Sequence, residues 1–213
     1  MKDRYTPPYW DDACRDLARR DEVLAQLIEK HQGDQLRGSG DAFQTLLNAV
    51  VGQQISVAAA QSIWGRLKLA APEISPSTVL ELGPDELRAI GLSRQKVLYI
   101  QGIARAFSTG DVTPRLWQNM SDEEIHAQLC SLYGVGPWTA DMTLIFFLHR
   151  PNILPLGDIG LIHGAARLYN WDSSLSRREE TALLKDLGET WHPWRTVATW
   201  YIWRDIDAEP VIY

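Results

Sequence analysis

The sequence has few of the residues that build side-chain metal sites or disulfide-bonded proteins. Its 213 residues include two cysteines, Cys14 and Cys130, which form no CxxC pair. Two such cysteines support neither a disulfide framework nor a cysteine-rich metal site, and a reducing cytoplasm is the expected location. Zinc-ligand spacing is also missing from the five histidines, which are His31, His126, His149, His163 and His192.

Positive charge and long apolar runs are scarce as well. The chain has 21 Lys and Arg against 27 Asp and Glu, for a net charge of −6. A nonspecific nucleic-acid binder usually has a basic excess, so any contact with DNA must depend on local arrangement. The longest apolar run, around residues 142–148, is too short to span a membrane, and residues 1–8 lack the apolar segment of a secretory signal. No membrane partner is expected.

What remains is a helical pattern, because alternating β-branched runs are almost absent. The fold class is predicted to be all-α, and 45% hydrophobic residues suffice for one large core or two lobes. Asp11 and Asp21 are each expected to cap a helix, and residues 72–76 to form a linker. The predicted helices cover 11–20, 21–31, 41–51, 56–69, 84–90, 93–107, 158–169, 176–187 and 192–204, with two more beginning at 121 and 137.

A Gly-apolar-Gly turn joins two of these helices. Gly134, Val135 and Gly136 stand between a helix that starts with the capping box of Ser121–Glu124 and one that starts at Pro137. Such a turn can be an ordinary helical corner, with Val135 filling the gap between the helices. It can equally present backbone N–H groups and a helix N-terminus to an anion.

A single acid follows the second of these helices, in Leu154-Pro-Leu-Gly-Asp158. An Asp after Gly at a helix start is an ordinary N-cap. The same carboxylate can also do chemistry beside whatever the turn holds. The two roles are compatible, because a cap holds the carboxylate in place.

Five segments in order give the chain a specific resemblance. They are 43–56, 91–100, 132–141, 154–158 and 191–204. Together they resemble the helix-hairpin-helix (HhH-GPD) DNA glycosylases, in particular the 3-methyladenine DNA glycosylase II branch, from about Leu17 to the C-terminus. The resemblance implies two helical lobes with a cleft between them. One is a central lobe, 41–140, carrying the helix-hairpin-helix at about 121–148, and the other combines 1–40 with 150–213 and carries Asp158.

In such a protein the hairpin grips the DNA backbone. The resemblance assigns this role to Gly134, Val135, Gly136 and Thr139, and it lets the backbone carbonyls of Cys130, Leu132 and Val135 hold a monovalent cation, Na⁺ or K⁺. Backbone dipoles and such a cation would let an acidic protein hold phosphate. No other cofactor is required, and two cysteines are too few for the iron–sulfur cluster of some relatives.

The resemblance also assigns catalysis to Asp158, whose charge would stabilise the cationic C1′ formed as an N-glycosidic bond breaks. Relatives that also cut the strand have a nucleophilic lysine where this chain has Trp138, so a monofunctional hydrolase using water is implied. Trp138 can pack against the hairpin or form an aromatic wall for an extruded cationic base. Tyr133, Trp191 and Trp194 are further candidates for this base pocket, and each can equally be a core residue.

Gln53 and Gln54 interrupt a helix where the family places the loop that enters DNA. A flipped base leaves a hole that a side chain must fill, and Gln54 aligns with this wedge, although the family's residue is often apolar. An exposed loop glutamine is the alternative. Asp141 is interpreted as structural, and Arg20, Arg94 and Lys96 as phosphate-facing or simply solvated.

The resemblance therefore implies a monomer that excises alkylated purines from double-stranded DNA, located in the cytoplasm and associated with the nucleoid if the source is bacterial. Two alternatives stay open at this point. One is a non-catalytic, structure-specific DNA-binding protein on the same scaffold, which the sequence pI of about 5.4 favours. The other is a bifunctional glycosylase/lyase, which the missing hairpin lysine disfavours.

Overall fold

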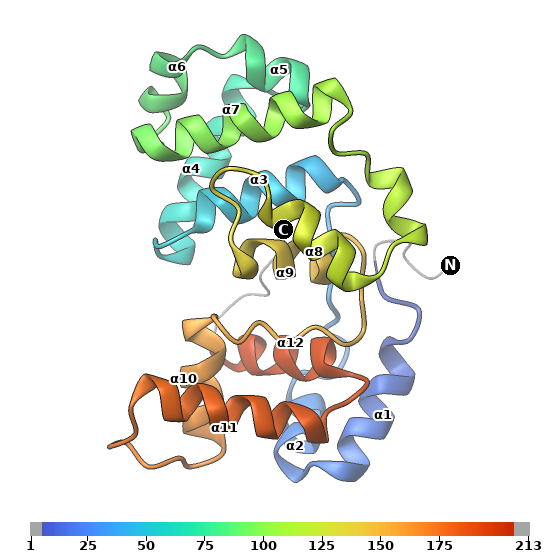
Figure 1. Cartoon of the computed structure of the whole chain (residues 1–213). Helices are drawn as coiled ribbons and strands as arrows, with labels where there is room; N and C mark the ends of the chain where they lie inside the picture. The colour runs from blue at the N-terminus through green and yellow to red at the C-terminus, as the bar shows by residue number, and fades with distance from the viewer. Residues whose placement is uncertain (1–5, 207–213) are drawn as a thin grey trace. The chain divides into compact units, whose positions relative to one another are not determined.

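The computed structural model describes residues 6–206, which form helices and no strand (Figure 1). The predicted all-α class is confirmed. Two compact units divide these residues: unit 1 contains 6–38 and 144–206, and unit 2 contains 39–143. The boundary falls inside α9 (Pro137–Phe146). Among residues 6–206, no helix has the length and apolarity needed to cross a membrane.

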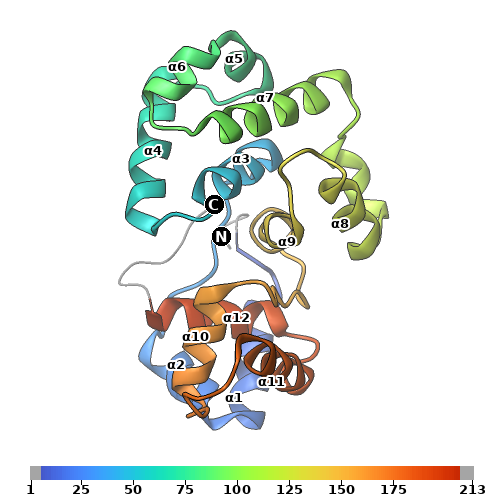
Figure 2. The same ribbon diagram turned by 60° about the vertical axis from the view of Figure 1, so that its left-hand side comes forward.

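Unit 2 is organised around α3 (Ala42–Gly52) and α7 (Arg94–Thr109), which pack on each other. The buried residues of α3 include Leu46, Leu47 and Val50, which have no exposed surface. Figures 1 and 2 show α7 next to α3, with α4 beside α3 and with α5 and α6 beside α7. The remaining elements of the unit are α4 (Val57–Ala70), α5 (Pro76–Glu81), α6 (Pro84–Ala89), the 3₁₀ helix η1 (Pro114–Asn119) and α8 (Asp122–Cys130), which precedes α9.

Unit 1 is organised around α12 (Arg195–Ile206), shown in red in Figure 1. This helix packs against α1 (Trp10–Arg20), α2 (Glu22–Lys30) and α10 (Ile159–Leu168), and α10 also packs against α11 (Arg177–Thr190). Every residue from Thr196 to Trp203 is buried. A helix that is buried on all sides has no polar face, so it forms the core of its unit.

Local capping signals position most of the helices as the sequence predicts. Both predicted capping boxes form, at Ser121–Glu124 and at Ser176–Glu179. The side chains of Asp21 and Ser93 accept the N-cap hydrogen bonds of α2 and α7. These motifs need only residues three positions apart, and they are therefore readable from the sequence.

Three local expectations were wrong. Asp11 is not an N-cap, because Tyr9 holds that position without a side-chain capping hydrogen bond and Asp11 lies inside the first turn of α1. The supposed linker 72–76 ends in a capped helix, since Ser75 forms a capping box with Thr78 and Pro76 begins α5. The last helix begins at Arg195, not at His192, because residues 191–194 form a turn in which the Trp194 N–H donates to the Trp191 carbonyl.

Candidate functional site

The turn between α8 and α9 forms a tight hairpin in unit 2. The Val135 N–H donates to the Leu132 carbonyl at 3.1 Å, and Gly134 has a φ of +89°. Val135 is 5% exposed, so it fills the gap between the helices, as the helical-corner interpretation expects. The anion-binding interpretation is not contradicted, because the corner also presents the N-terminus of α9.

Glycine is required at position 134 because of its positive φ and also because of a close neighbour. The ring of Tyr99, on α7, lies directly against it, and a Cβ at position 134 would lie 2.1 Å from Tyr99 Cγ. Tyr133 is 63% exposed, its ring meets the Tyr99 ring edge-on at 5.0 Å, and its hydroxyl accepts from Gln95 Nε2 at 3.1 Å. Tyr133 therefore lies on the outer surface of the hairpin and is supported from α7.

The loop between α3 and α4 contacts this hairpin through Gln53. Its Nε2 donates to the Gly134 carbonyl at 3.0 Å and to Thr139 Oγ1 at 2.8 Å. Gln53 is thus neither a solvated loop residue nor available as a wedge in this structure. Gln54 is exposed and has a φ of +57°, so it is the glutamine of the pair that faces solvent.

The first turn of α9 begins at Pro137 and includes Trp138 and Thr139. Trp138 is half-buried, whereas Thr139 is 1% exposed and uses its hydroxyl to accept from Gln53. The predicted contribution of Thr139 to DNA binding therefore does not come from its side chain as placed here. Its backbone belongs to the first turn of the helix, where N–H groups lack intrahelical partners.

Lys96, expected from the sequence to face a phosphate or to be solvated, instead binds backbone carbonyls. Its ammonium donates to the carbonyls of Val51 and Gln53, at 2.7 Å each, and burial lowers its pKa. Lysines near a helix C-terminus can bind the last carbonyls in this way. Arg20, in unit 1, likewise binds the carbonyls of Thr190 and His192. Neither side chain is simply solvated.

Asp141 lies on α9 behind the hairpin, where burial raises the pKa of its carboxyl to about 7. His126 Nε2 lies 3.6 Å from Asp141 Oδ1. Burial raises the pKa of the Cys130 thiol, and the negative charge of Asp141 raises it further. Asp141 is expected to play a structural role by bonding to the backbone near the hairpin, whereas the partner found here is the side chain of His126.

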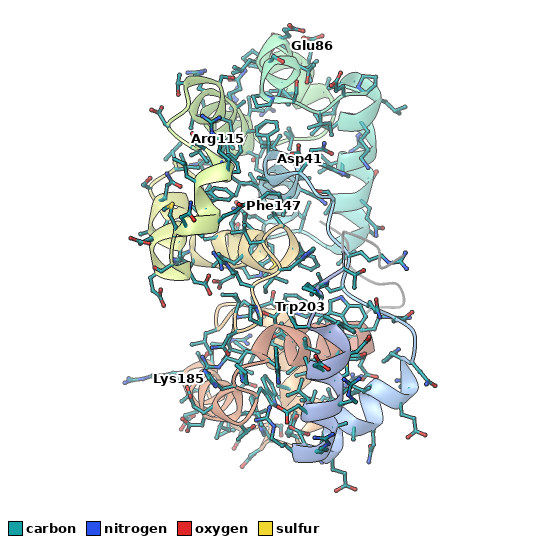
Figure 3. All side chains as sticks on the ribbon, turned by 90° about the vertical axis from the view of Figure 1, so that its right-hand side faces the viewer. Asp41, Glu86, Arg115, Phe147, Lys185 and Trp203 are labelled. Carbon is teal, nitrogen blue, oxygen red and sulfur yellow. The ribbon has the colours of Figure 1, made fainter. Side chains whose placement is uncertain are left out.

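Asp158 begins α10 in unit 1 and is its N-cap, as predicted. Its Oδ1 accepts from the Leu161 N–H at 2.6 Å and from Trp203 Nε1 at 3.2 Å. Trp203, labelled on α12 in Figure 3, is 8% exposed and stacks on Phe146 at 6.0 Å. The sequence does not single out Trp203, because α12 has aromatic and apolar residues on every face.

Trp191 and Trp194, the other two candidates for a base pocket, also lie in unit 1. Trp191 has no exposed surface, and its indole N–H donates to Asp21 at 3.1 Å. Trp194 is partly exposed, stacks on Tyr9 at 5.6 Å and donates to Asp16 at 2.9 Å. The contacts of Trp191 are those of a core residue, so a place for it in the pocket would require rearrangement.

Comparison with known proteins gives a family match over most of the chain. Residues 47–190 match the HhH-GPD superfamily of base excision DNA repair proteins. A DNA-3-methyladenine glycosylase of Bacillus subtilis is 29% identical and aligns with 92% of this chain and 69% of its own length. DNA-3-methyladenine glycosylase 1 of Schizosaccharomyces pombe is 27% identical, covering 85% of this chain and 79% of the relative.

Solved structures agree with the sequence matches. The Schizosaccharomyces pombe 3-methyladenine DNA glycosylase in complex with abasic DNA superposes with a TM-score of 0.81 and 26% identity. That alignment covers 91% of this chain and 95% of the solved one. The aligned region spans 69% of the length of the Bacillus subtilis glycosylase named above and 66% of the length of a second Bacillus subtilis relative.

Proposed function

Since the chain belongs to the HhH-GPD superfamily of base excision DNA repair proteins, we propose that it is a monofunctional DNA glycosylase. It extrudes alkylated purines of the 3-methyladenine and 7-methylguanine type from double-stranded DNA and hydrolyses their N-glycosidic bond. The observation that carries the proposal is Asp158, which two donors hold at the start of α10. The protein acts as a monomer in the cytoplasm, at the nucleoid if the source is bacterial.

The hairpin supplies the grip on the DNA backbone. Gly134, Val135 and Gly136 bring the first turn of α9 to a phosphate, where its N–H groups and dipole favour negative charge. The carbonyls of Cys130, Leu132 and Val135 would hold Na⁺ or K⁺. They fit because oxygen donors suit hard cations, and a carbonyl that already accepts one N–H, as Leu132 does, keeps a second lone pair. When bound, the ion adds positive charge beside the phosphate.

Aromatic side chains suit a base that carries positive charge. An indole face attracts a cation by up to about 2 kcal/mol when water is excluded, and Trp138 is only half-buried. A cationic purine is already a good leaving group, so a strong general acid is not needed to expel it. The recognition and the chemistry therefore both favour alkylated purines over normal bases.

Asp158 supplies the negative charge for the bond-breaking step. The C1′–N bond breaks with its electron pair moving to the purine, which leaves as a neutral base, and C1′ becomes cationic. The carboxylate of Asp158 stabilises that cation. Water then adds to C1′, and its proton passes to Asp158 or to solvent. No lysine stands in residues 130–146, so no Schiff base forms in the hairpin.

The test is the single substitution Asp158→Asn, assayed as release of methylated base from alkylated duplex DNA. Asparagine is as good an N-cap as aspartate, so α10 is preserved and only the charge is lost. We expect wild-type protein to release 3-methyladenine and the variant to be at least about 100-fold slower. Excision by the variant at the wild-type rate would exclude the mechanism. A wild-type protein that binds an abasic analogue but releases no base would show a binding protein instead.

A further inference from the structure

The loop that carries Gln54 and the hairpin are connected by hydrogen bonds through one residue. The backbone of Gln53 is part of the loop. Its side-chain amide donates to the Gly134 carbonyl in the hairpin at 3.0 Å and to Thr139 Oγ1, in the first turn of α9, at 2.8 Å. Any movement of the loop that takes Gln53 away from the hairpin must break both hydrogen bonds. The two segments lie more than 80 residues apart in the chain, since Gln53 and Gly134 are separated by 81 positions.

Lys96 binds the backbone where the same loop begins. It reaches from the first turn of α7 to the carbonyls of Val51 and Gln53, where α3 ends. A charged donor to two carbonyls makes stronger hydrogen bonds than a neutral one, and the charge also opposes the negative end of the α3 dipole. The side chain is half-buried, and removing its charge would leave both carbonyls without this donor.

The first turns of α7 support the hairpin as well. Tyr99 lies against Gly134, and Gln95 donates to the Tyr133 hydroxyl at 3.1 Å. Gln95 and Tyr99 therefore contact the hairpin, which the proposed function brings to the DNA backbone, while Lys96 of the same helix contacts the loop whose Gln54 the family resemblance aligns with the wedge. All of these contacts lie within unit 2.

We propose that Lys96 and Gln53 are positioning residues that hold the Gln54 loop against the hairpin. Binding of the hairpin to the DNA backbone and insertion of Gln54 are thereby coupled. This inference rests on the proposed function, because it assumes that both segments meet DNA. Preorganised contact groups save the ordering that binding otherwise requires. Gln54 supports the assignment, since it directly follows Gln53, is exposed and has a left-handed backbone conformation.

The test compares Lys96→Met, Lys96→Arg and Gln53→Ala with the matched control Lys185→Met. Lys185 is an exposed lysine on α11, in unit 1, and Figure 3 shows it pointing away from the helices. Hydrogen–deuterium exchange of the free protein reports residues 52–56 and 131–136 directly. Binding to a duplex with an abasic analogue, and the fluorescence of 2-aminopurine placed beside that analogue, report insertion. Single-turnover release of 3-methyladenine reports catalysis.

We expect Lys96→Met and Gln53→Ala to speed exchange in both segments and to leave α10 and α12 unchanged. In each variant, the ratio of affinities for abasic-analogue DNA and undamaged DNA should be about tenfold lower than in the wild type. The 2-aminopurine fluorescence of the complex should also be lower than with the wild type. The double variant should lose less than the product of the two single losses, because both act on one network. Lys96→Arg should recover part of the loss, and Lys185→Met should match the wild type.

Unchanged exchange in 52–56 and 131–136 would overturn the coupling. Faster exchange with wild-type binding, fluorescence and excision would overturn the positioning role. If Lys96→Met does not fold, Gln53→Ala decides by the same measurements. If wild-type protein binds the abasic analogue but excises nothing, the proposed activity fails, whereas exchange, binding and fluorescence still decide the positioning role.

Discussion

Trp203 donates its indole N–H to Oδ1 of Asp158 at 3.2 Å, on the same oxygen that accepts the Leu161 N–H at 2.6 Å. The carboxylate is therefore oriented by the backbone of α10 and by a side chain of α12. Two donors restrict its rotation, and a group held in place needs less reorganisation in a transition state.

Replacing Trp203 with phenylalanine tests the value of that second donor. Trp203→Phe keeps an aromatic ring to stack on Phe146 and removes the N–H. We expect base release under single-turnover conditions to slow by roughly tenfold, because a hydrogen bond to a charged group is lost. Trp200→Phe is the control, since Trp200 is buried on the same helix and packs on Trp10. Equal losses in both variants would mean that the effect is general loss of packing.

Gly134 should tolerate no side chain. Gly134→Ala places a Cβ 2.1 Å from Tyr99 Cγ and demands a φ of +89° from an L-residue. We expect it to lower the free energy of unfolding by about 2–4 kcal/mol, measured by urea denaturation. Gly136→Ala is the matched comparison, because a Cβ there meets no atom within 4 Å. If the two variants lose equal stability, the contact with Tyr99 is not the cause.

Borohydride trapping tests the absence of lyase chemistry. The lysines are Lys2, Lys30, Lys68, Lys96 and Lys185, none of them in the hairpin. Without a lysine to form a Schiff base, borohydride added during turnover on alkylated duplex DNA should leave no covalent protein–DNA adduct. The assay is denaturing gel electrophoresis of labelled DNA. An adduct would show that another amine acts as the nucleophile, and peptide mapping would identify it.

Asp205 should make the stability of unit 1 sensitive to acid. Burial raises the pKa of its carboxyl, but Lys30, the charge of Arg167 and a hydrogen bond with His31 together lower it by more, so the pKa lies below its usual value. Because the folded pKa is depressed, the stabilisation is present above the unfolded pKa and is lost as pH falls through the folded one.

Asp205→Asn should therefore lower the free energy of unfolding by about 1–2 kcal/mol at pH 7, because the carboxylate is only 7% exposed but its partners Lys30 and Arg167 are 60% and 59% exposed. Urea denaturation from about pH 7 to about pH 3 should show this difference shrinking. A gap that stays constant at low pH would mean that the charge is not its source.

Short-range signals were enough to predict several helix boundaries, the turn at Gly134 and the cap at Asp158. Each depends on residues within a few positions of one another, whose hydrogen bonds and backbone angles hold in almost any fold. Predicted helix boundaries were wrong where a neighbouring residue is the N-cap, as Tyr9 is for α1. They were also wrong where a capped helix is short, as α5 is. The family resemblance supplied the role expected of Asp158, which local chemistry leaves as a cap.

Contacts between distant residues needed the folded chain. Gln53 and Gly134 meet across 81 positions, and Asp158 and Trp203 meet across 45. No periodicity predicts such pairs, because packing of whole helices brings them together. The same packing gives Lys96 two carbonyls to bind and removes Trp191 from solvent. Residue type and spacing thus define the local elements, whereas burial and the partner of each polar group are set by long-range packing.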